Sequence, residues 1–375
     1  MKKKFTVVSL ILITFLLCGW GAVGHKIINT NTVLSFPSAM SEFASWSSVL
    51  ARHASDADNR KSSDPTEAPK HYIDIEDYPE FGSTGRIIQD YDSVAAKYGT
   101  SRVIDIGTLP WAIINTFDSL KAQFKRKDWS MAQLTAADLG HYVADSHMPL
   151  HITYNYNGQL SGQSGIHSRY ESTMIGRFQN DIQYSGDTAA YVSDVPGFVF
   201  SYIYGNHTYV DSVLNADKAA ALFAGNTNSD AYYQKLWDLT GNFTIRLFKN
   251  ASYRLACLIY TAWVNAGSPS MSVSLLNGAN GVPEDFNLYQ NYPNPFNPST
   301  VIMYNLPQSG TVKIEVYDIT GKKLSTLINQ FESAGEHSVS LNINNIRNGD
   351  FSSGIYFYKI TAGRYSSIKK MVLLK

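Results

Sequence analysis

The segment HYVADSHMPLHI, residues 141–152, concentrates histidine and carboxylate side chains. The chain has 375 residues and only nine histidines, and three of these fall in this segment. His141 and Asp145 are four residues apart, so in a helix they project from the same face. Pro149 is expected to end that helix, which lets His151 turn back toward the same point.

A second segment, GIHSRYES, repeats this spacing, because His167 and Glu171 are four residues apart at the start of another predicted helix. One such pair alone is more often a surface ion pair than a metal site. Two pairs together with His151, in a chain with so few histidines, favour a metal site. Imidazole and carboxylate ligands suit borderline metals, above all zinc, and leave coordination positions for water and substrate.

The elements that must position these residues are predicted to be helical. From about residue 26 to 265, apolar residues recur at intervals of three and four, which indicates helices with one buried face. Examples are FDSLKAQFKRK, WSMAQLTAADLGHYVADS and YQKLWDLTGNFTIRLFKNASYRLACLIYTAWVNAG. We expect an all-α domain over residues 20–266, interrupted by long loops at 154–165 and 186–210.

The pattern changes after Ala266, and a chain of this length favours two domains. Residues 267–286, GSPSMSVSLLNGANGVPEDF, have the small, polar and turn-prone composition of a linker. Beyond them, apolar and polar residues alternate around Gly-containing turns, as in TVKIEVYDITGKKLSTLI and GIYFYKITAGRYSSIKKMVLLK. This alternation indicates half-buried antiparallel strands, so we expect a small all-β domain over residues 287–375.

The start of this second domain carries a specific motif. The segment NLYQNYPNPFNPSTVIMYNLP, followed by VYDITGK, GIYFYKI and KKMVLLK, closely resembles the C-terminal sorting domain of type IX secretion cargo. The resemblance implies a β-sandwich that addresses the protein to the type IX secretion machinery and is often removed on arrival. A carbohydrate-binding or adhesion module is the alternative, since a fold alone does not give a function.

The N-terminus has the layout of a secretory signal peptide, residues 1–19. MKKKFTVVSLILITFLLCG places three lysines before a short apolar run that stops at small residues. A lipoprotein signal with Cys18 as the lipidated residue is the alternative, although Leu17 before it is a poor fit. The run is too short for a permanent anchor, and no other segment is apolar for long enough to cross a bilayer. We therefore expect a protein that is secreted or at the cell surface, without stable membrane insertion.

The net charge is uninformative about partners, whereas the cysteine content excludes a disulfide framework. Lys plus Arg and Asp plus Glu both number 31, so bulk electrostatics do not indicate a nucleic-acid or membrane-surface binder. With Cys18 in the leader, Cys257 is alone in the mature chain and no disulfide framework can form. A metal is then the obvious means of reinforcing the fold.

Leader cleavage after Gly19 would start the mature chain at WGAVGH, with Trp20 first and His25 close behind. Here the sequence resembles the superfamily of zinc-dependent phospholipases C and single-strand nucleases of the fungal and plant S-one/P-one type. Its members begin at a tryptophan whose amino group and carbonyl oxygen bind zinc together with a nearby histidine. The resemblance continues through ASDADNRK, APKHYIDIED, HYVAD, MPLH and HSRYE, which supply every expected ligand type in order.

This resemblance implies three zinc ions. The first would be bound by Asp58, His71, His141 and Asp145. The second would be bound by His151, His167 and Glu171. The third would be bound by Trp20 and His25, with Asp145 bridging. Asp56 competes with Asp58, and the local pattern favours Asp58. The remaining histidines match no ligand position and are expected at the surface or as supports of ligands: His53, His147, His207 and His337.

Closely spaced zinc ions suit phosphoester hydrolysis, because metals lower the pKa of a bound water and neutralise phosphoryl oxygens. The resemblance implies that Asp58 is catalytic and orients or deprotonates this water. HSRYE is typical of the phospholipase branch, and the lack of disulfides agrees, whereas WGAVGH is closer to the nuclease branch. Tyr72 would stack on a base, line a choline pocket or serve only packing.

We therefore favour a phospholipase C-like phosphodiesterase acting on phospholipid. The alternatives are a single-strand-specific nuclease acting on single-stranded nucleic acid, and a non-catalytic zinc-stabilised binding protein.

Overall fold

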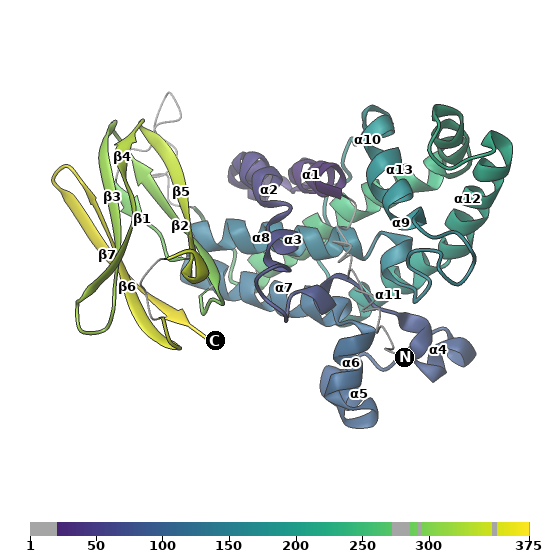
Figure 1. The fold of residues 1–375 in the computed structure, drawn as a ribbon, viewed down its shortest axis with the longest axis horizontal. Helices are drawn as coiled ribbons and strands as arrows, with labels where there is room; N and C mark the ends of the chain where they lie inside the picture. The colour runs from purple at the N-terminus through teal and green to yellow at the C-terminus, as the bar shows by residue number, and fades with distance from the viewer. Residues whose placement is uncertain (1–20, 272–285, 292–293, 347–350, 375) are drawn as a thin grey trace, which may run out of the picture.

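A computed structural model of the chain describes residues 21–271, 286–291, 294–346 and 351–374. The predicted signal peptide, Trp20 and most of the predicted linker lie outside these residues. Helices run from Gly21 to Asn265, and strands follow from Asn287 onward (Figure 1). The prediction of an all-α domain followed by a small all-β domain is therefore confirmed.

The helices differ widely in length. Short helices supply the periphery and several turns: α2 (Ser47–His53), α3 (Asp56–Arg60), α4 (Pro79–Thr84), α5 (Tyr91–Tyr98), α6 (Thr100–Ile106), α9 (Ile166–Ser168) and α10 (Ile175–Phe178). Longer helices build the body of the domain: α1 (Gly21–Thr32), α7 (Leu109–Arg126), α8 (Trp129–Asp145), α11 (Val195–His207), α12 (Val210–Ala224) and α13 (Asp230–Asn265). None of the described helices is both long enough and apolar enough to cross a membrane.

Helix α8 forms the centre of the domain. Its first turn is capped by the Asp128 side chain, which accepts a hydrogen bond from the Met131 backbone amide. From Thr135 to Asp145 every residue is buried, because α1, α2, α7 and α13 pack around it. A helix with no exposed face in its second half can carry polar residues only where they are paired or bind a ligand.

Residues 186–210 were expected to form a long loop, and this prediction is wrong for their second half, where α11 forms. The Asp194 side chain caps the helix by accepting a hydrogen bond from the Gly197 amide at 3.0 Å, and Pro196 occupies its first turn, where proline is tolerated. The helix is apolar almost all round, so it lacks the periodicity of an amphipathic helix. Asn206 on α11 donates to the Ser146 carbonyl oxygen at 3.0 Å and so supports the end of α8.

The β domain contains two antiparallel sheets. One has the strand order β1-β2-β5 and the other the order β4-β3-β6-β7. The strands are β1 (Asn287–Leu288), β2 (Ser299–Leu306), β3 (Gly310–Tyr317), β4 (Lys323–Glu332), β5 (Gly335–Asn342), β6 (Gly354–Ala362) and β7 (Tyr365–Leu373). Side chains from both sheets form one apolar core, as the alternating sequence predicts.

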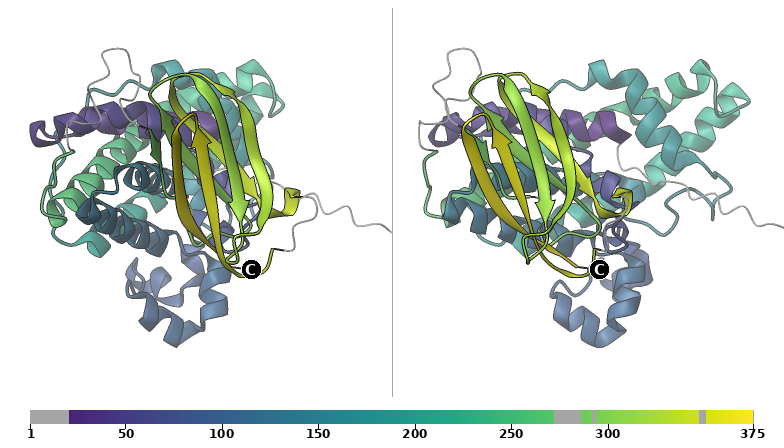
Figure 2. Two further views of the ribbon diagram at one scale, coloured as in Figure 1. Left: turned by 90° about the vertical axis from the view of Figure 1, so that its left-hand side faces the viewer. Right: turned by 60° about the vertical axis from the view of Figure 1, so that its left-hand side comes forward.

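The β domain lies against the start of α8 (Figure 1), and Figure 2 shows the molecule from the side of the strands, which lie in front of the helices. Met303 of β2 packs on Met131 and Leu134 of that helix. The residues with metal-binding side chains lie at the opposite end of α8, about 20 Å away at a rise of 1.5 Å per residue.

Candidate metal centre

The last turn of α8 brings the first predicted pair together. His141 and Asp145 are fully buried, and His141 Nε2 lies 3.3 Å from Asp145 Oδ2. A 3₁₀ turn at Pro149–His151 then reverses the chain after the helix, as Pro149 predicted. It places His151 Nδ1 3.5 Å from Asp145 Oδ1, so the turn brings His151 to the carboxylate of α8.

The HSRYE segment contributes the second pair. His167 lies on the short helix α9, and Glu171 follows on a π-helical turn, Arg169–Met174, a backbone form often found at functional sites. His167 Nε2 lies 3.2 Å from Glu171 Oε2, and His151 Nε2 lies 3.4 Å from the same oxygen. The two predicted pairs are therefore joined through His151.

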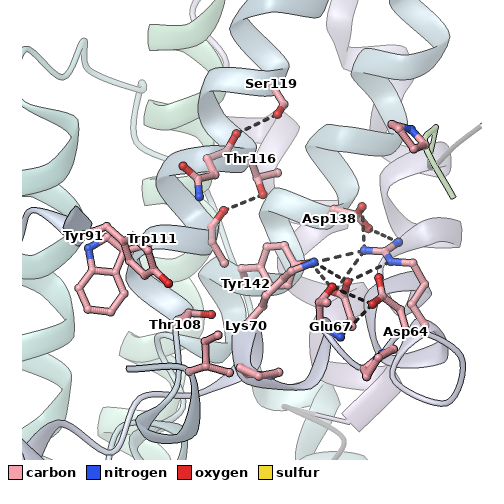
Figure 3. Close-up of a pocket in the computed structure, with 18 residues that line it drawn as sticks. Asp64, Glu67, Lys70, Tyr91, Thr108, Trp111, Thr116, Ser119, Asp138 and Tyr142 are labelled. Atoms are coloured by element: carbon pink, nitrogen blue, oxygen red, sulfur yellow. Dashed lines mark hydrogen bonds and ion pairs between the residues drawn. The ribbon is translucent and has the colours of Figure 1, made fainter. Parts of the chain in front are cut away.

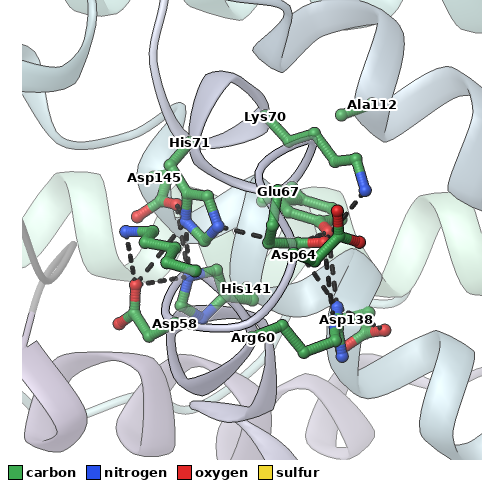
Figure 4. Close-up of polar contacts among 12 residues, drawn as sticks. Asp58, Arg60, Asp64, Glu67, Lys70, His71, Ala112, Asp138, His141 and Asp145 are labelled. Atoms are coloured by element: carbon green, nitrogen blue, oxygen red, sulfur yellow. Dashed lines mark hydrogen bonds and ion pairs between the residues drawn. The ribbon is translucent and has the colours of Figure 1, made fainter. Parts of the chain in front are cut away.

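Asp58 and His71 approach this group from outside α8 (Figure 4). Asp58 Oδ1 lies 3.5 Å from His141 Nε2, and His71 Nδ1 lies 2.9 Å from Asp145 Oδ2. Asp56, the competing carboxylate, instead pairs with His53 Nδ1 at 2.7 Å and is partly exposed. The geometry therefore brings Asp58, and not Asp56, into the cluster.

His25 completes the cluster from α1. Its ring stacks on His141 with centroids 3.8 Å apart, and its Nε2 lies 3.5 Å from Asp145 Oδ1. Trp20, the other residue predicted beside it, lies outside the described residues. The side chains thus form three groups whose ligand atoms lie within 4.8 Å of one another: His25, His141 and Asp145; Asp58, His71 and His141; His151, His167 and Glu171.

The hydrogen bonding of these side chains fits metal binding. Several buried atoms that face the cluster have no hydrogen-bond partner among the described residues, including His25 Nε2, Asp145 Oδ1, His151 Nε2, His167 Nε2 and Glu171 Oε2. Leaving a buried polar atom unpaired costs about 1–3 kcal/mol, so several in one place are unfavourable unless a ligand satisfies them. Nitrogen and carboxylate donors at this spacing are the ligand set that zinc takes.

The electrostatics of the cluster follow from its burial and its carboxylates. Burial, together with the neighbouring His141, lowers the pKa of His25 to about 3. Burial also lowers the pKa of His141, but the carboxylates of Asp145 and Asp58 outweigh it and raise this pKa to about 10. His141 therefore carries a proton whose positive charge offsets the nearby carboxylates. A metal that binds His141 must displace this proton.

Lys61 is a residue of this centre that the sequence did not reveal. Its ammonium nitrogen lies 2.6 Å from Asp58 Oδ1, and its side chain is largely buried. Lys61 follows Asp58 by three residues, a spacing that brings two side chains together on a helix. The sequence would therefore have indicated this pair if the short helix α3 had been predicted.

A second polar network lies behind His71 and lines a cavity of about 670 Å³ (Figure 3). Arg60 forms an ion pair with Asp138 at 2.9 Å, and the Tyr142 hydroxyl donates to Glu67. Burial raises the pKa of Glu67, but the nearby ring of His71, 3.5 Å away, and the charge of Arg60 outweigh it and hold this pKa well below its usual range. Glu67 is therefore a charged, buried carboxylate beside the cluster.

The remaining histidines lie outside the three groups. His147 is buried against Tyr202 and bonds the Val143 carbonyl oxygen through Nδ1 at 2.7 Å. His207 pairs with Glu76 at 2.7 Å. In the β domain, His337 pairs with a neighbouring glutamate, Glu332, at 3.1 Å.

Comparison with known proteins identifies the C-terminal part of the chain. Residues 290–374 match the family model of the secretion system C-terminal sorting domain, which confirms the prediction of a sorting domain. Such a domain implies export by type IX secretion, to the cell surface or the extracellular space. A search of the curated proteins found no match.

Two solved structures are similar to the chain as a whole. The alpha-toxin of an avian strain, SWCP, of Clostridium perfringens aligns with a TM-score of 0.45 and 10% identity, covering 95% of this chain and 92% of that chain. The alpha toxin from Clostridium absonum aligns with a TM-score of 0.43 and 12% identity, covering 94% and 96%. These similarities are too weak to assign an activity.

Proposed function

We propose that this protein is a secreted zinc-dependent phosphodiesterase of the phospholipase C type. The observation that carries the proposal is the convergence of three buried groups of histidines and carboxylates, several of whose inward-facing atoms lack hydrogen-bond partners among the described residues. We assign the activity to a domain over residues 20–266, separated by a linker at 267–286 from the sorting domain at 287–375, with residues 1–19 as the signal peptide.

Eight described residues would hold zinc in this proposal: His25, Asp58, His71, His141, Asp145, His151, His167 and Glu171. Trp20 would be the ninth ligand. When bound, zinc would acidify a water molecule and neutralise charge on the phosphoryl oxygens. Three ions are proposed, because the resemblance to the superfamily implies three and the described donors fall into three groups.

Two side chains, Asp58 and Lys61, would act on the proton of the attacking water and on the phosphoryl group of the substrate. Asp58 would bind zinc through one carboxylate oxygen and orient or deprotonate the attacking water with the other. The ammonium group of Lys61 beside it would attract a phosphoryl oxygen, since a cation near a developing negative charge stabilises the transition state.

Two features support phospholipid over nucleic acid as the substrate. The HSRYE motif, which supplies His167 and Glu171, is typical of the phospholipase branch. Next to this motif, the ring of Tyr156 contacts His167 with centroids 6.0 Å apart, and the rings of Tyr154 and Tyr156 are 42% and 37% exposed. Partly exposed aromatic rings beside the cluster suit the interface between a lipid headgroup and water.

The test is a side-by-side assay of the exported protein after metal analysis. We expect bound zinc, turnover of bis(p-nitrophenyl) phosphate that stops with chelator and returns with zinc, and release of phosphocholine from phosphatidylcholine vesicles. Cleavage of single-stranded DNA with intact phosphatidylcholine would instead identify a nuclease. Bound zinc without turnover of any of the three substrates would identify a zinc-stabilised binding protein.

A further inference from the structure

The histidines of the metal centre differ in which ring nitrogen faces the cluster. Three of them bond a backbone carbonyl oxygen through Nδ1, which leaves Nε2 for the cluster: His141 to Ala54 at 2.7 Å, His151 to His71 at 2.6 Å, and His167 to Tyr156 at 3.0 Å. A ring nitrogen that donates to a carbonyl carries the proton, so the other nitrogen is the free donor atom for a metal.

His71 has the opposite orientation. Its Nδ1 faces the cluster, 2.9 Å from Asp145 Oδ2 and 3.6 Å from Asp58 Oδ1. Its Nε2 is buried, has no hydrogen-bond partner among the described residues, and faces the carboxylate of Glu67 at 3.5 Å. The acceptor that faces this distal nitrogen is thus a side chain, which a substitution can remove, whereas a backbone carbonyl cannot be removed in this way.

Glu67 is itself held in place. Glu67 is 1% exposed. Its Oε2 lies 2.9 Å from Lys70 Nζ and its Oε1 lies 3.4 Å from Arg60 Nη2. The Tyr142 hydroxyl also donates a hydrogen bond to Oε1. Asp138 holds Arg60 from the other side. These contacts fix a charged carboxylate behind His71, on the side away from the other ligands, as Figure 4 shows.

We propose that Glu67 is a positioning residue of the metal centre. It accepts a hydrogen bond from His71 Nε2–H, which fixes the tautomer with Nδ1 unprotonated and strengthens Nδ1 as a metal donor. The inference rests on the proposed function only in that the cluster binds metal, and it requires no hydrolysis of any substrate. The distance of 3.5 Å is longer than an ordinary hydrogen bond, and we expect it to shorten when metal binds at Nδ1.

The first test compares Glu67→Gln with Asp138→Asn as a matched control in the full-length exported protein. Asp138 belongs to the same network, where it pairs with Arg60. Zinc affinity is measured by competition with a chromophoric chelator, and cobalt(II) absorption reports the ligand field after metal exchange. We expect Glu67→Gln to weaken the affinity for one ion about 10–100-fold and to shift the cobalt spectrum. Asp138→Asn should leave both nearly unchanged.

Two results of this comparison would overturn the inference. One is a Glu67→Gln protein with wild-type affinity and spectrum. The other is an equal change in both variants, which would mean that the network only supports the fold. If wild-type protein binds zinc but hydrolyses nothing, the proposed function fails while the comparison of the two variants still decides the role of Glu67.

A second test needs no variant and so does not depend on whether Glu67→Gln folds. Long-range nitrogen–proton correlation spectra of the zinc-loaded wild-type protein report which ring nitrogen of each histidine carries the proton. We expect His71 to be protonated at Nε2, in contrast to His141, His151 and His167. Protonation of His71 at Nδ1 would overturn the proposal.

Discussion

The imidazole rings of His25 and His141 lie face to face, with centroids 3.8 Å apart and planes inclined by 8°. Both residues are fully buried, and burial together with the nearby His141 lowers the pKa of His25 to about 3. His25 is therefore neutral at physiological pH and able to donate an electron pair to a metal. His25 Nε2 lies 3.5 Å from Asp145 Oδ1, so a metal bound by these two side chains would link α1, the first described helix, to α8 at the centre of the domain.

Removing the metal should therefore destabilise the fold as well as stop turnover. A ligand present at about 1,000 times its Kd stabilises the native state by about 4 kcal/mol, which corresponds to roughly 8 °C in a domain of this size. We expect chelation to lower the Tm of the purified protein by about this amount and zinc to restore it. Differential scanning calorimetry before and after dialysis measures the effect, and an unchanged Tm after verified zinc removal would refute it.

Substitutions of histidines inside and outside the metal centre should differ in their effect on turnover. His141→Ala and His151→Ala each remove a donor from the buried cluster, so turnover of bis(p-nitrophenyl) phosphate should fall to background. His337→Ala alters β5 in the other domain, where the residue pairs with Glu332, and should leave turnover intact. The assay is run on variants whose circular dichroism matches the wild type. Equal loss in all three would show that the site has been misplaced.

The parts of the site that the sequence revealed lie on regular local structure. His141 and Asp145 are separated by one helical turn, and so are His167 and Glu171, so a spacing of four residues was enough to predict that each pair shares a face. The turn at Pro149 was also predictable, because proline disfavours continuation of a helix. The number of pairs and the position of His151 already predicted one metal site, whereas the addition of Asp58, His71 and His25 came from the family resemblance, because these residues reach the centre through long-range packing.

Other parts depended on tertiary contacts alone. Asp56 and Asp58 both lie on a helix of five residues, and no periodic pattern shows which side of so short a helix faces the core. Glu67 precedes His71 by four residues, but Pro69 between them hides any helical pattern. Its partners Arg60 and Tyr142 come from separate helices, so its role could not be predicted from spacing.

The contact between Lys61 and Asp58 predicts a separable effect on the reaction. Lys61→Ala removes a cation 2.6 Å from the proposed catalytic carboxylate without removing a metal donor. A hydrogen bond to a charged group contributes about 1.5–3 kcal/mol, so kcat should fall about 10–100-fold while zinc content stays the same. Lys61→Arg should retain part of the rate because it keeps the charge. Lys26→Ala, an exposed lysine of α1, serves as the control and should change neither quantity.

Asp74 predicts a dependence of stability on pH. Burial raises its pKa from 3.8 to about 7, with smaller contributions from Asp77 and Glu76. The folded protein therefore binds this proton more tightly than the unfolded chain, and the resulting penalty grows from about pH 4 and is complete above about pH 7. Asp74→Asn should raise the free energy of unfolding at pH 8 by about 1–2 kcal/mol, after allowance for solvent screening.

The same substitution should have little effect at pH 4, where the carboxyl group is protonated in the folded state. Denaturant titrations at the two pH values measure the difference. Asp92→Asn, at an exposed position of α5, is the control and should show no comparable increase between them. A gain from Asp74→Asn that is equal at pH 4 and pH 8 would show that charge is not its cause.

The last prediction concerns the residue before α1. Helix α1 begins at Gly21 and carries His25, whose two ring nitrogens have no hydrogen-bond partner among the described residues. If Trp20 is the mature N-terminus, its free α-amine is a nitrogen donor for the metal beside His25, whereas one extra residue converts that amine into an amide nitrogen, a very poor donor. A recombinant protein that starts Met-Trp should thus bind one zinc ion less tightly and lose much of its activity. Asp145 would keep its contact with His71, so the other ions should remain.

N-terminal sequencing of the exported protein should read WGAVGH, and full zinc content and activity in the Met-Trp form would disprove the role of Trp20.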